Sequence, residues 1–153
     1  MLAELKGDYV YFRPFEASTF LQGSISIDVD TARGTATFTH RSSDWNSTKA
    51  TPEHEGIVFQ LGEYIFMLAR GTTEKNRMVR LSICRRRGGR DGWVGDGLVL
   101  SMRTTTGTPF AAKSIIFKRE PDNEPLITEF EDENKIEKAW KRESRDRVWF
   151  LSL

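Results

Sequence analysis

The chain has 153 residues, of which 38% are hydrophobic and 29% are charged, a composition typical of one globular domain rather than of a disordered or membrane protein. Its formal net charge of +1 gives no overall reason to expect affinity for nucleic acid or for an anionic membrane. No apolar run reaches the roughly 18 residues of a membrane span, and the first residues lack the pattern of a signal peptide, so we expect a cytoplasmic protein.

Most of the chain consists of short segments that favour β-structure, separated by turn residues. In residues 35–40 apolar and polar side chains alternate, which places Ala36, Phe38 and His40 on one face. Gly34 ends the preceding link, as suits a hairpin. Eight segments of this kind follow one another, at residues 8–13, 24–28, 35–40, 56–60, 64–69, 78–84, 92–102 and 111–117.

The short links between these segments decide how the strands pair. Parallel pairing needs a dozen or more connecting residues, so the strands must be mainly antiparallel neighbours. An open sheet of this size would leave two exposed edges unless it closed or folded into two layers. The sequence therefore predicts a mainly β protein, an antiparallel eight- to nine-stranded barrel or strongly curved sandwich. Residues 41–55 are polar and without periodicity, so we expect them to form the longest loop.

The chain changes character after Arg119. Residues 120–134 contain seven acids and no Lys or Arg, and two prolines at the start of this stretch indicate a linker. Thr128 and Glu131 fit a capping box, so one short helix is predicted over residues 133–143. The apolar residues 148–151 are expected to dock as a strand or to pair with another subunit. The predicted organisation is a barrel-like domain over 1–119, with the linker, helix and strand of 120–153 docked on it.

Three pieces of the chain carry a resemblance to a known family. They are LKGDYVYFRP at 5–14, EGIVFQLGEYIF at 55–66, and GLVLS at 97–101 followed by GTPFAAK at 107–113. Together they make the chain resemble the β-rich C-terminal domain of a group of bacterial transcriptional regulators, where that domain follows a helix-turn-helix domain. The match, over about residues 5–118, consists mostly of Gly, Pro and hydrophobic positions, which specify a fold more than an activity. The resemblance implies an effector-sensing or protein-contact module, here expected without the DNA-binding domain.

The interior of such a barrel is either filled by side chains or holds one small ligand. Polar residues on the predicted strands would orient an acidic or amphipathic ligand there. The candidates are Tyr11, Arg13, Arg80 and Arg103. An arginine inside a barrel needs a partner, so each marks either a ligand site or a buried ion pair.

A basic stretch is the sharpest local feature of the sequence. Seven basic residues and no acid fall between positions 75 and 90, and the densest part is Arg85, Arg86, Arg87 and Arg90. This patch could contact phosphates or nucleic acid, or it could be a solvated hairpin tip balanced by the seven acids of the tail. We favour an electrostatic contact with those acids, either within the chain or between subunits, because the net charge is near zero and no nucleic-acid motif accompanies the patch.

Other chemical motifs give weaker signals. His40 and His54 flank the predicted loop without metal-ligand spacing, so we interpret them as surface residues beside a hairpin and expect no metal or cofactor. Cys84 is expected to be a buried, unreactive thiol, and no nucleophile elbow or phosphate-binding loop is present. The sequence predicts a noncatalytic module that binds a small effector or a protein partner, with homodimerisation as one option. The alternatives are a lipocalin-sized barrel enzyme and a phosphate- or nucleic-acid-binding protein.

Overall fold

A closed barrel of eight antiparallel strands forms the protein. The computed structural model describes residues 2–16, 19–44, 54–72, 79–87, 94–102, 109–132, 135–138 and 150–151. Each strand pairs with its neighbours in sequence, and β1 pairs with β8 to close the barrel. The strands are β1 (Gly7–Glu16), β2 (Thr19–Asp30), β3 (Thr35–Asp44), β4 (His54–Leu61), β5 (Tyr64–Gly71), β6 (Val79–Arg87), β7 (Val94–Met102) and β8 (Pro109–Lys118). All eight predicted strands and the predicted antiparallel class are confirmed.

The strands extend beyond their predicted limits. Residues 41–44 and 54–55, expected to belong to a loop, continue β3 and β4, whereas 45–53 lie outside the described residues. The extension of β3 follows β2, which pairs with it as far as Asp44, opposite Leu21. Backbone pairing to a long neighbour, rather than side-chain alternation, therefore decides where this strand ends.

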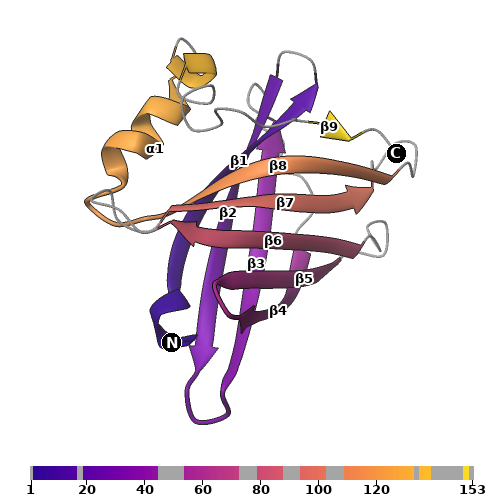
Figure 1. The fold of residues 1–153 in the computed structure, drawn as a ribbon, viewed down its shortest axis with the longest axis vertical. Coiled ribbons are helices and arrows are strands. Elements are labelled where there is room, and N and C mark those ends of the chain that lie inside the picture. Colours follow the sequence, from indigo (N-terminus) through magenta and orange to yellow (C-terminus); the bar gives the residue numbers. More distant parts are fainter. Residues whose placement is uncertain are drawn as a thin grey trace.

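The long strands β1–β3 cross behind β5–β8 at a steep angle (Figure 1). Alternate side chains point inward and form an apolar interior at the end where the chain begins. The 3-10 helix η1 (Leu2–Leu5) packs at this end, where Leu5 is buried and its carbonyl accepts a 2.7 Å hydrogen bond from the Tyr9 hydroxyl. Cys84 is buried in the same interior, as predicted.

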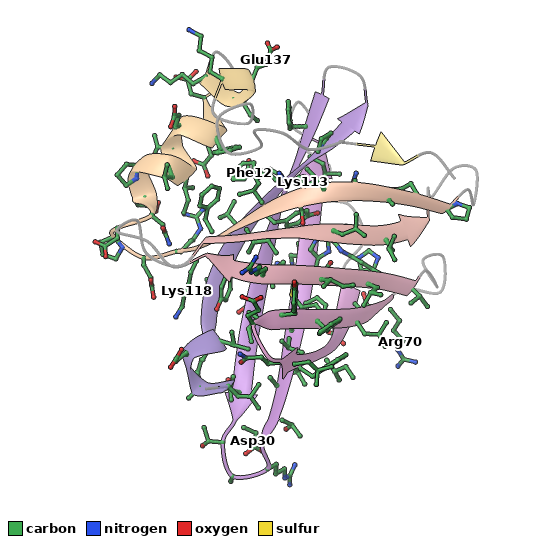
Figure 2. All side chains as sticks on the ribbon, viewed as in Figure 1. Phe12, Asp30, Arg70, Lys113, Lys118 and Glu137 are labelled. Carbon is green, nitrogen blue, oxygen red and sulfur yellow. The ribbon has the colours of Figure 1, made fainter. Side chains whose placement is uncertain are left out.

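A second apolar core lies outside the barrel, beneath the helix α1 (Glu124–Glu131). Phe130 of α1 packs against Phe12 of β1 and Phe117 of β8, with ring centroids 5.0 and 5.3 Å apart. Phe12 is labelled in Figure 2, on the side of the barrel that α1 covers. Phe130 and Ile127 are fully buried, and each contributes on the order of 1.5–3 kcal/mol of hydrophobic stabilisation. The helix is thus an integral layer of the fold.

The position of α1 corrects the sequence prediction. The helix begins after Asn123, within the stretch predicted to be a linker, and Thr128 lies in its interior rather than at its start. Pro125 is compatible with this, because it occupies the first turn, where a missing backbone N–H costs no helical hydrogen bond. Residues 135–138, inside the predicted range of 133–143, are also helical.

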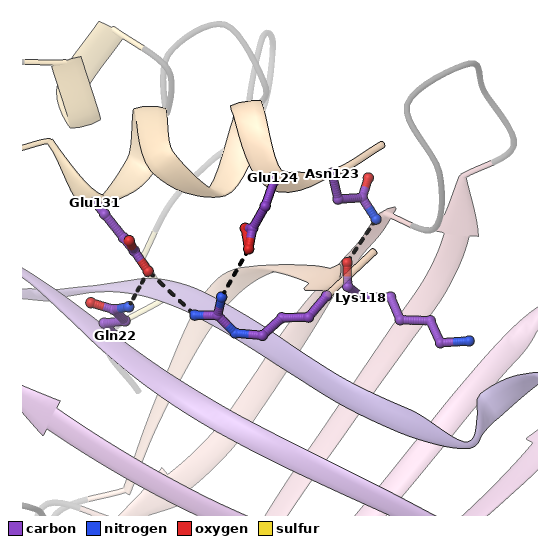
Figure 3. A network of polar contacts seen from close by, with 6 residues as sticks. Gln22, Lys118, Asn123, Glu124 and Glu131 are labelled. Atoms are coloured by element: carbon purple, nitrogen blue, oxygen red, sulfur yellow. Dashed lines mark hydrogen bonds and ion pairs between the residues drawn. The ribbon is translucent and has the colours of Figure 1, made fainter. Parts of the chain in front are cut away.

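Polar contacts attach α1 to the barrel (Figure 3). Arg119 binds Glu124 at 3.2 Å and Glu131 at 3.4 Å, and Glu131 also accepts a hydrogen bond from the Gln22 side chain at 3.1 Å. Glu124 and Glu131 of the acidic tail pair with Arg119, and Arg85 of the basic stretch pairs with Glu63 at 2.9 Å. The predicted contact between the tail and the basic stretch stays a prediction, because the side chains of Arg86, Arg87 and Arg90 lie outside the described residues.

Asn123 makes a more buried contact. Its side-chain amide donates a 2.8 Å hydrogen bond to the Lys118 carbonyl, which joins the first turn of α1 to the end of β8. Asn123→Ala is expected to lower the free energy of unfolding by about 1–2 kcal/mol, because a carbonyl loses its donor. Urea unfolding would measure this. Glu124→Gln, which weakens only an exposed ion pair, is the control and should change stability by less than about 0.5 kcal/mol. Equal effects of the two variants would contradict the prediction.

The chain's last described strand, β9 (Phe150–Leu151), pairs antiparallel with β8, as predicted for a docked terminal strand. β8 pairs with β1 through residues 115–118 and with β9 through Ala111 and Ala112. Its outer edge is therefore shared between two strands. Within the described part of the chain, no helix has the length and apolar character needed to cross a membrane.

Candidate functional site

Polar side chains occupy the barrel interior opposite the end that carries η1. His40 on β3 and His54 on β4 lie directly across from each other in the strand register, and their ring nitrogens Nδ1 are 3.4 Å apart. His40 is completely buried and His54 almost so. The interpretation of these residues as surface groups is wrong, because both side chains point into the barrel. His40 shares the inward face of β3 with Ala36 and Phe38, and β4 begins at His54, inside the predicted loop. As expected from strand alternation, His54 points in while Glu55 is exposed.

Arg80 on β6 joins these histidines to β1. Its Nη1 lies 2.6 Å from Nε2 of His40 and 3.3 Å from the Tyr11 hydroxyl, and its Nε lies 3.3 Å from Oγ of Ser82. The guanidinium carbon also sits 4.7 Å from the centroid of the Tyr11 ring, a cation–π distance. We call these five residues, Tyr11, His40, His54, Arg80 and Ser82, the buried cationic cluster.

Gly23 on β2 makes room for the cluster. It lies opposite Tyr11 in the strand register. A Cβ atom at this position would lie 1.7 Å from Cε1 of the Tyr11 ring, so any other residue here would displace that ring. Because Tyr11 in turn contacts both Arg80 and His40, this one glycine positions three members of the cluster.

Hydrogen-bond donors and positive charge surround His40. Arg80 only donates hydrogen bonds, and its Nη1 lies 2.6 Å from Nε2 and 3.2 Å from Nδ1 of His40, so the imidazole accepts through a ring nitrogen that carries no proton. Burial holds the pKa of His40 well below its usual value of 6.5, and the charges of Arg80, His54 and Arg13 lower it further. His40 is therefore neutral at pH 7.

The charge of Arg80 has no negative counterpart among the described residues. Its side chain is 5% exposed, and its hydrogen-bond and ring partners, Tyr11, His40 and Ser82, are all uncharged. A second buried arginine, Arg13, lies on the inner face of β1 with its guanidinium 4.8 Å from the Phe110 ring centroid. Burying the Arg80 cation without a carboxylate is costly, and a negative charge beside its guanidinium would offset that cost.

The structure places some predicted site residues together and not others. Tyr11 and Arg80 meet in the cluster, and Arg13 also points inward, whereas Arg103 lies outside the described residues. In the basic patch, Arg85 is exposed and paired with Glu63. Arg90 and the side chains of Arg86 and Arg87 are outside the described part. The sequence analysis missed the roles of His40, His54 and Ser82, although alternation had placed His40 on one face with Ala36 and Phe38.

The described residues offer little for metal binding or nucleophilic catalysis. They contain no group of three or more His, Cys, Asp or Glu side chains placed to hold a metal ion. The two histidines alone would be an incomplete ligand set, and the adjacent Arg80 cation would repel a metal. Ser82 accepts a hydrogen bond from Arg80, which does not activate its hydroxyl as a nucleophile. The arrangement suits anion recognition better.

The depressed pKa of His40 predicts a pH-dependent stability. In the unfolded chain this imidazole takes up a proton near its ordinary pKa, but in the folded protein it does not, so the unfolded state binds more protons. The stabilisation is complete above about pH 6.5 and is lost as the pH falls toward the folded-state pKa. Between about pH 6.5 and pH 5.5 the free energy of unfolding should fall by up to about 1.4 kcal/mol.

Urea unfolding at these pH values checks the prediction, with His40→Leu as the matched variant. His40→Leu should have a shallower pH slope than the wild type, whatever its absolute stability. An unchanged slope would show that His40 is not the titrating group.

The fold and the cluster together define a class of protein, a closed antiparallel β-barrel with a buried cationic interior at one end. Comparison of the chain with protein-family models, with curated proteins and with solved structures gives no match. Its function must therefore be argued from the site itself.

Proposed function

We propose that this barrel binds a small organic acid at the buried cationic cluster and acts as a sensing or carrier module without catalysing a reaction. The observation that carries the proposal is the buried guanidinium of Arg80, whose described partners are all uncharged. A carboxylate would supply the missing negative charge and accept paired hydrogen bonds from the guanidinium.

The surroundings of Arg80 indicate what kind of acid would fit. The rings of Tyr11 and His40 lie against each other at 4.9 Å, and the buried Ile25 is opposite His40 in the register. A ligand with an apolar or aromatic body would be compatible with these neighbours, while its acidic group reaches Arg80. The resemblance to the C-terminal domain of bacterial regulators is consistent with an effector-sensing role.

A role for the basic stretch in binding nucleic acid has less support. Arg85, the member of that stretch whose side chain is described, already pairs with Glu63. Surface pairing of this kind leaves Arg85 itself little uncompensated charge for a phosphate.

Two measurements test the proposal. Native mass spectrometry of freshly purified protein, compared with its denatured mass, would detect a retained acid. Calorimetric titration of ligand-free protein would then compare benzoate and octanoate with benzyl alcohol and octanol, which share their apolar bodies but lack the charge. We expect the carboxylates to bind more tightly than the alcohols.

The variant Arg80→Met should weaken carboxylate binding at least about 100-fold, because it removes a charge-assisted contact in a buried site. Arg33→Met is the matched control, since Arg33 is exposed in the β2–β3 turn and should leave binding unchanged. Carboxylates that bind no better than the alcohols, or equally well to Arg80→Met, would contradict the proposal.

A further inference from the structure

An apolar surface covers the outside of the barrel on β4–β7. Large hydrophobic side chains are between 38% and 62% exposed there, far more than in either core. We call this surface the outer apolar face. Its exposed members are Ile57, Phe59, Leu61, Tyr64, Leu68, Val79 and Leu98.

The strand register makes the outer apolar face continuous. Phe59 on β4 lies opposite Phe66 on β5, and their rings stack with centroids 5.0 Å apart and planes 3° from parallel. Phe66 lies opposite Ile83 on β6, and Ile83 lies opposite Leu98 on β7. One uninterrupted row of apolar side chains thus crosses four strands, and the pair Ile57 and Leu68 extends it on one side.

The described part of the chain does not cover this surface. The helix α1 packs on β1 and β8 and lies away from β4 and β5 (Figure 1). If a large side chain has about 200 Å² of surface, the seven exposed residues present roughly 670 Å² to solvent. This exceeds the roughly 300–600 Å² of the largest apolar patch on a typical monomer and approaches the roughly 800 Å² that each partner buries in a standard interface.

The charges at the rim indicate which partner fits. Glu55 and Arg70 face each other across β4 and β5 at one end of the face, and Arg70 is labelled in Figure 2. Glu63 and Arg85 form a 2.9 Å ion pair at the other end. Among the rim residues whose side chains are described, each end therefore carries an acid and a base around an apolar centre. An anionic membrane or a strongly charged partner would favour a rim of one sign, whereas a balanced rim is complementary to itself.

We propose that the outer apolar face is a homodimer interface, in which two copies of the chain pack β4–β7 against β4–β7. A two-fold arrangement brings the same apolar centre together from both sides and lets the acid and base at each rim end meet their opposites. This interface is separate from both the buried cationic cluster and β9, so it does not depend on the proposed ligand.

Sedimentation velocity of the full chain over a wide range of protein concentration tests the proposal. The wild type should sediment with twice the chain mass of 17.6 kDa. Leu68→Lys places a cation at the centre of the face and should raise the dimer dissociation constant at least about 100-fold, because a buried charge would be left unpaired. Leu68 is 41% exposed in one copy, so the variant should still fold, which circular dichroism verifies.

Ser26→Lys is the matched control, since it adds the same charge at an exposed position on β2, away from the face, and should leave the dimer intact. If Leu68→Lys fails to fold, Ile57→Lys on the neighbouring strand replaces it. A wild type that stays monomeric at every concentration would overturn the proposal. A monomer that instead binds lipid vesicles in a flotation assay would do the same, because the face would then be a membrane contact. So would a dimer that Leu68→Lys and Ile57→Lys leave unchanged.

Discussion

Gly56→Ala is expected to lower the free energy of unfolding by about 3 kcal/mol or more, a large fraction of the roughly 5–15 kcal/mol that stabilises a typical domain. A Cβ atom at this position would lie 1.9 Å from the carbonyl oxygen of Leu68 and 2.7 Å from the Cα atom of Ala69. Both atoms belong to the backbone of β5, which pairs with β4 at this point. The neighbouring strand cannot move aside without breaking its own hydrogen bonds. Circular dichroism and urea unfolding measure the loss.

Gly34→Ala is the control for the effect of losing a glycine as such. Gly34 has a φ of +65°, so alanine there should cost about 1 kcal/mol of backbone strain, but its new Cβ atom would meet no other atom within 4 Å. The difference between the two variants isolates the collision with β5. A Gly56→Ala protein as stable as Gly34→Ala would show that β4 and β5 do not approach each other this closely.

Arg80→Met is expected to raise the free energy of unfolding of the ligand-free protein by about 1–2 kcal/mol. The substitution replaces a buried cation by an apolar side chain of similar length. It costs Tyr11, His40 and Ser82 a hydrogen-bond donor, but it removes the larger penalty of burying an uncompensated charge. It also removes a charge that lowers the pKa of His40, so the loss of stability toward low pH should become shallower. Urea unfolding at two pH values measures both effects.

The same variant that gains stability is expected to lose ligand binding, which is the relation typical of a binding site maintained at the expense of stability. Arg33→Met, which removes an exposed charge, should change stability by less than about 0.5 kcal/mol. If Arg80→Met instead destabilised the protein by several kcal/mol, Arg80 would be a structural residue and the ligand proposal would lose its main support.

The location of the helix could not be predicted from local signals alone. The stretch around Pro121 and Pro125 has the composition of a linker, yet a helix forms over Glu124–Glu131 because Phe130 and Ile127 find an apolar surface made by Phe12 and Phe117. Packing on a distant part of the chain thus outweighs the local preference.

The burial of the histidines was only partly encoded in the local pattern. Alternation in β3 correctly grouped His40 with Ala36 and Phe38, which are both buried. The polar residues that follow concealed where β3 ends, and no sequence spacing relates His40 to Arg80, forty positions away. Tyr11 and Arg80 are ligand-site candidates on sequence grounds alone, because they are polar residues on predicted barrel strands. A polar strand residue that faces the interior needs a ligand or a buried partner.

By itself the sequence determined the eight strands and their antiparallel order, because short links allow only neighbouring strands to pair. Unfavourable exposed edges left two solutions, a closed barrel or a strongly curved sandwich, and the pairing of β1 with β8 decides for the barrel. Only the tertiary structure decided which face each polar residue shares with residues far along the chain. The closing of β1 on β8 and the pairing of β3 with β4 bring Tyr11, His40, His54 and Arg80 into one interior. Such contacts depend on the register of whole strands, which the local sequence does not specify.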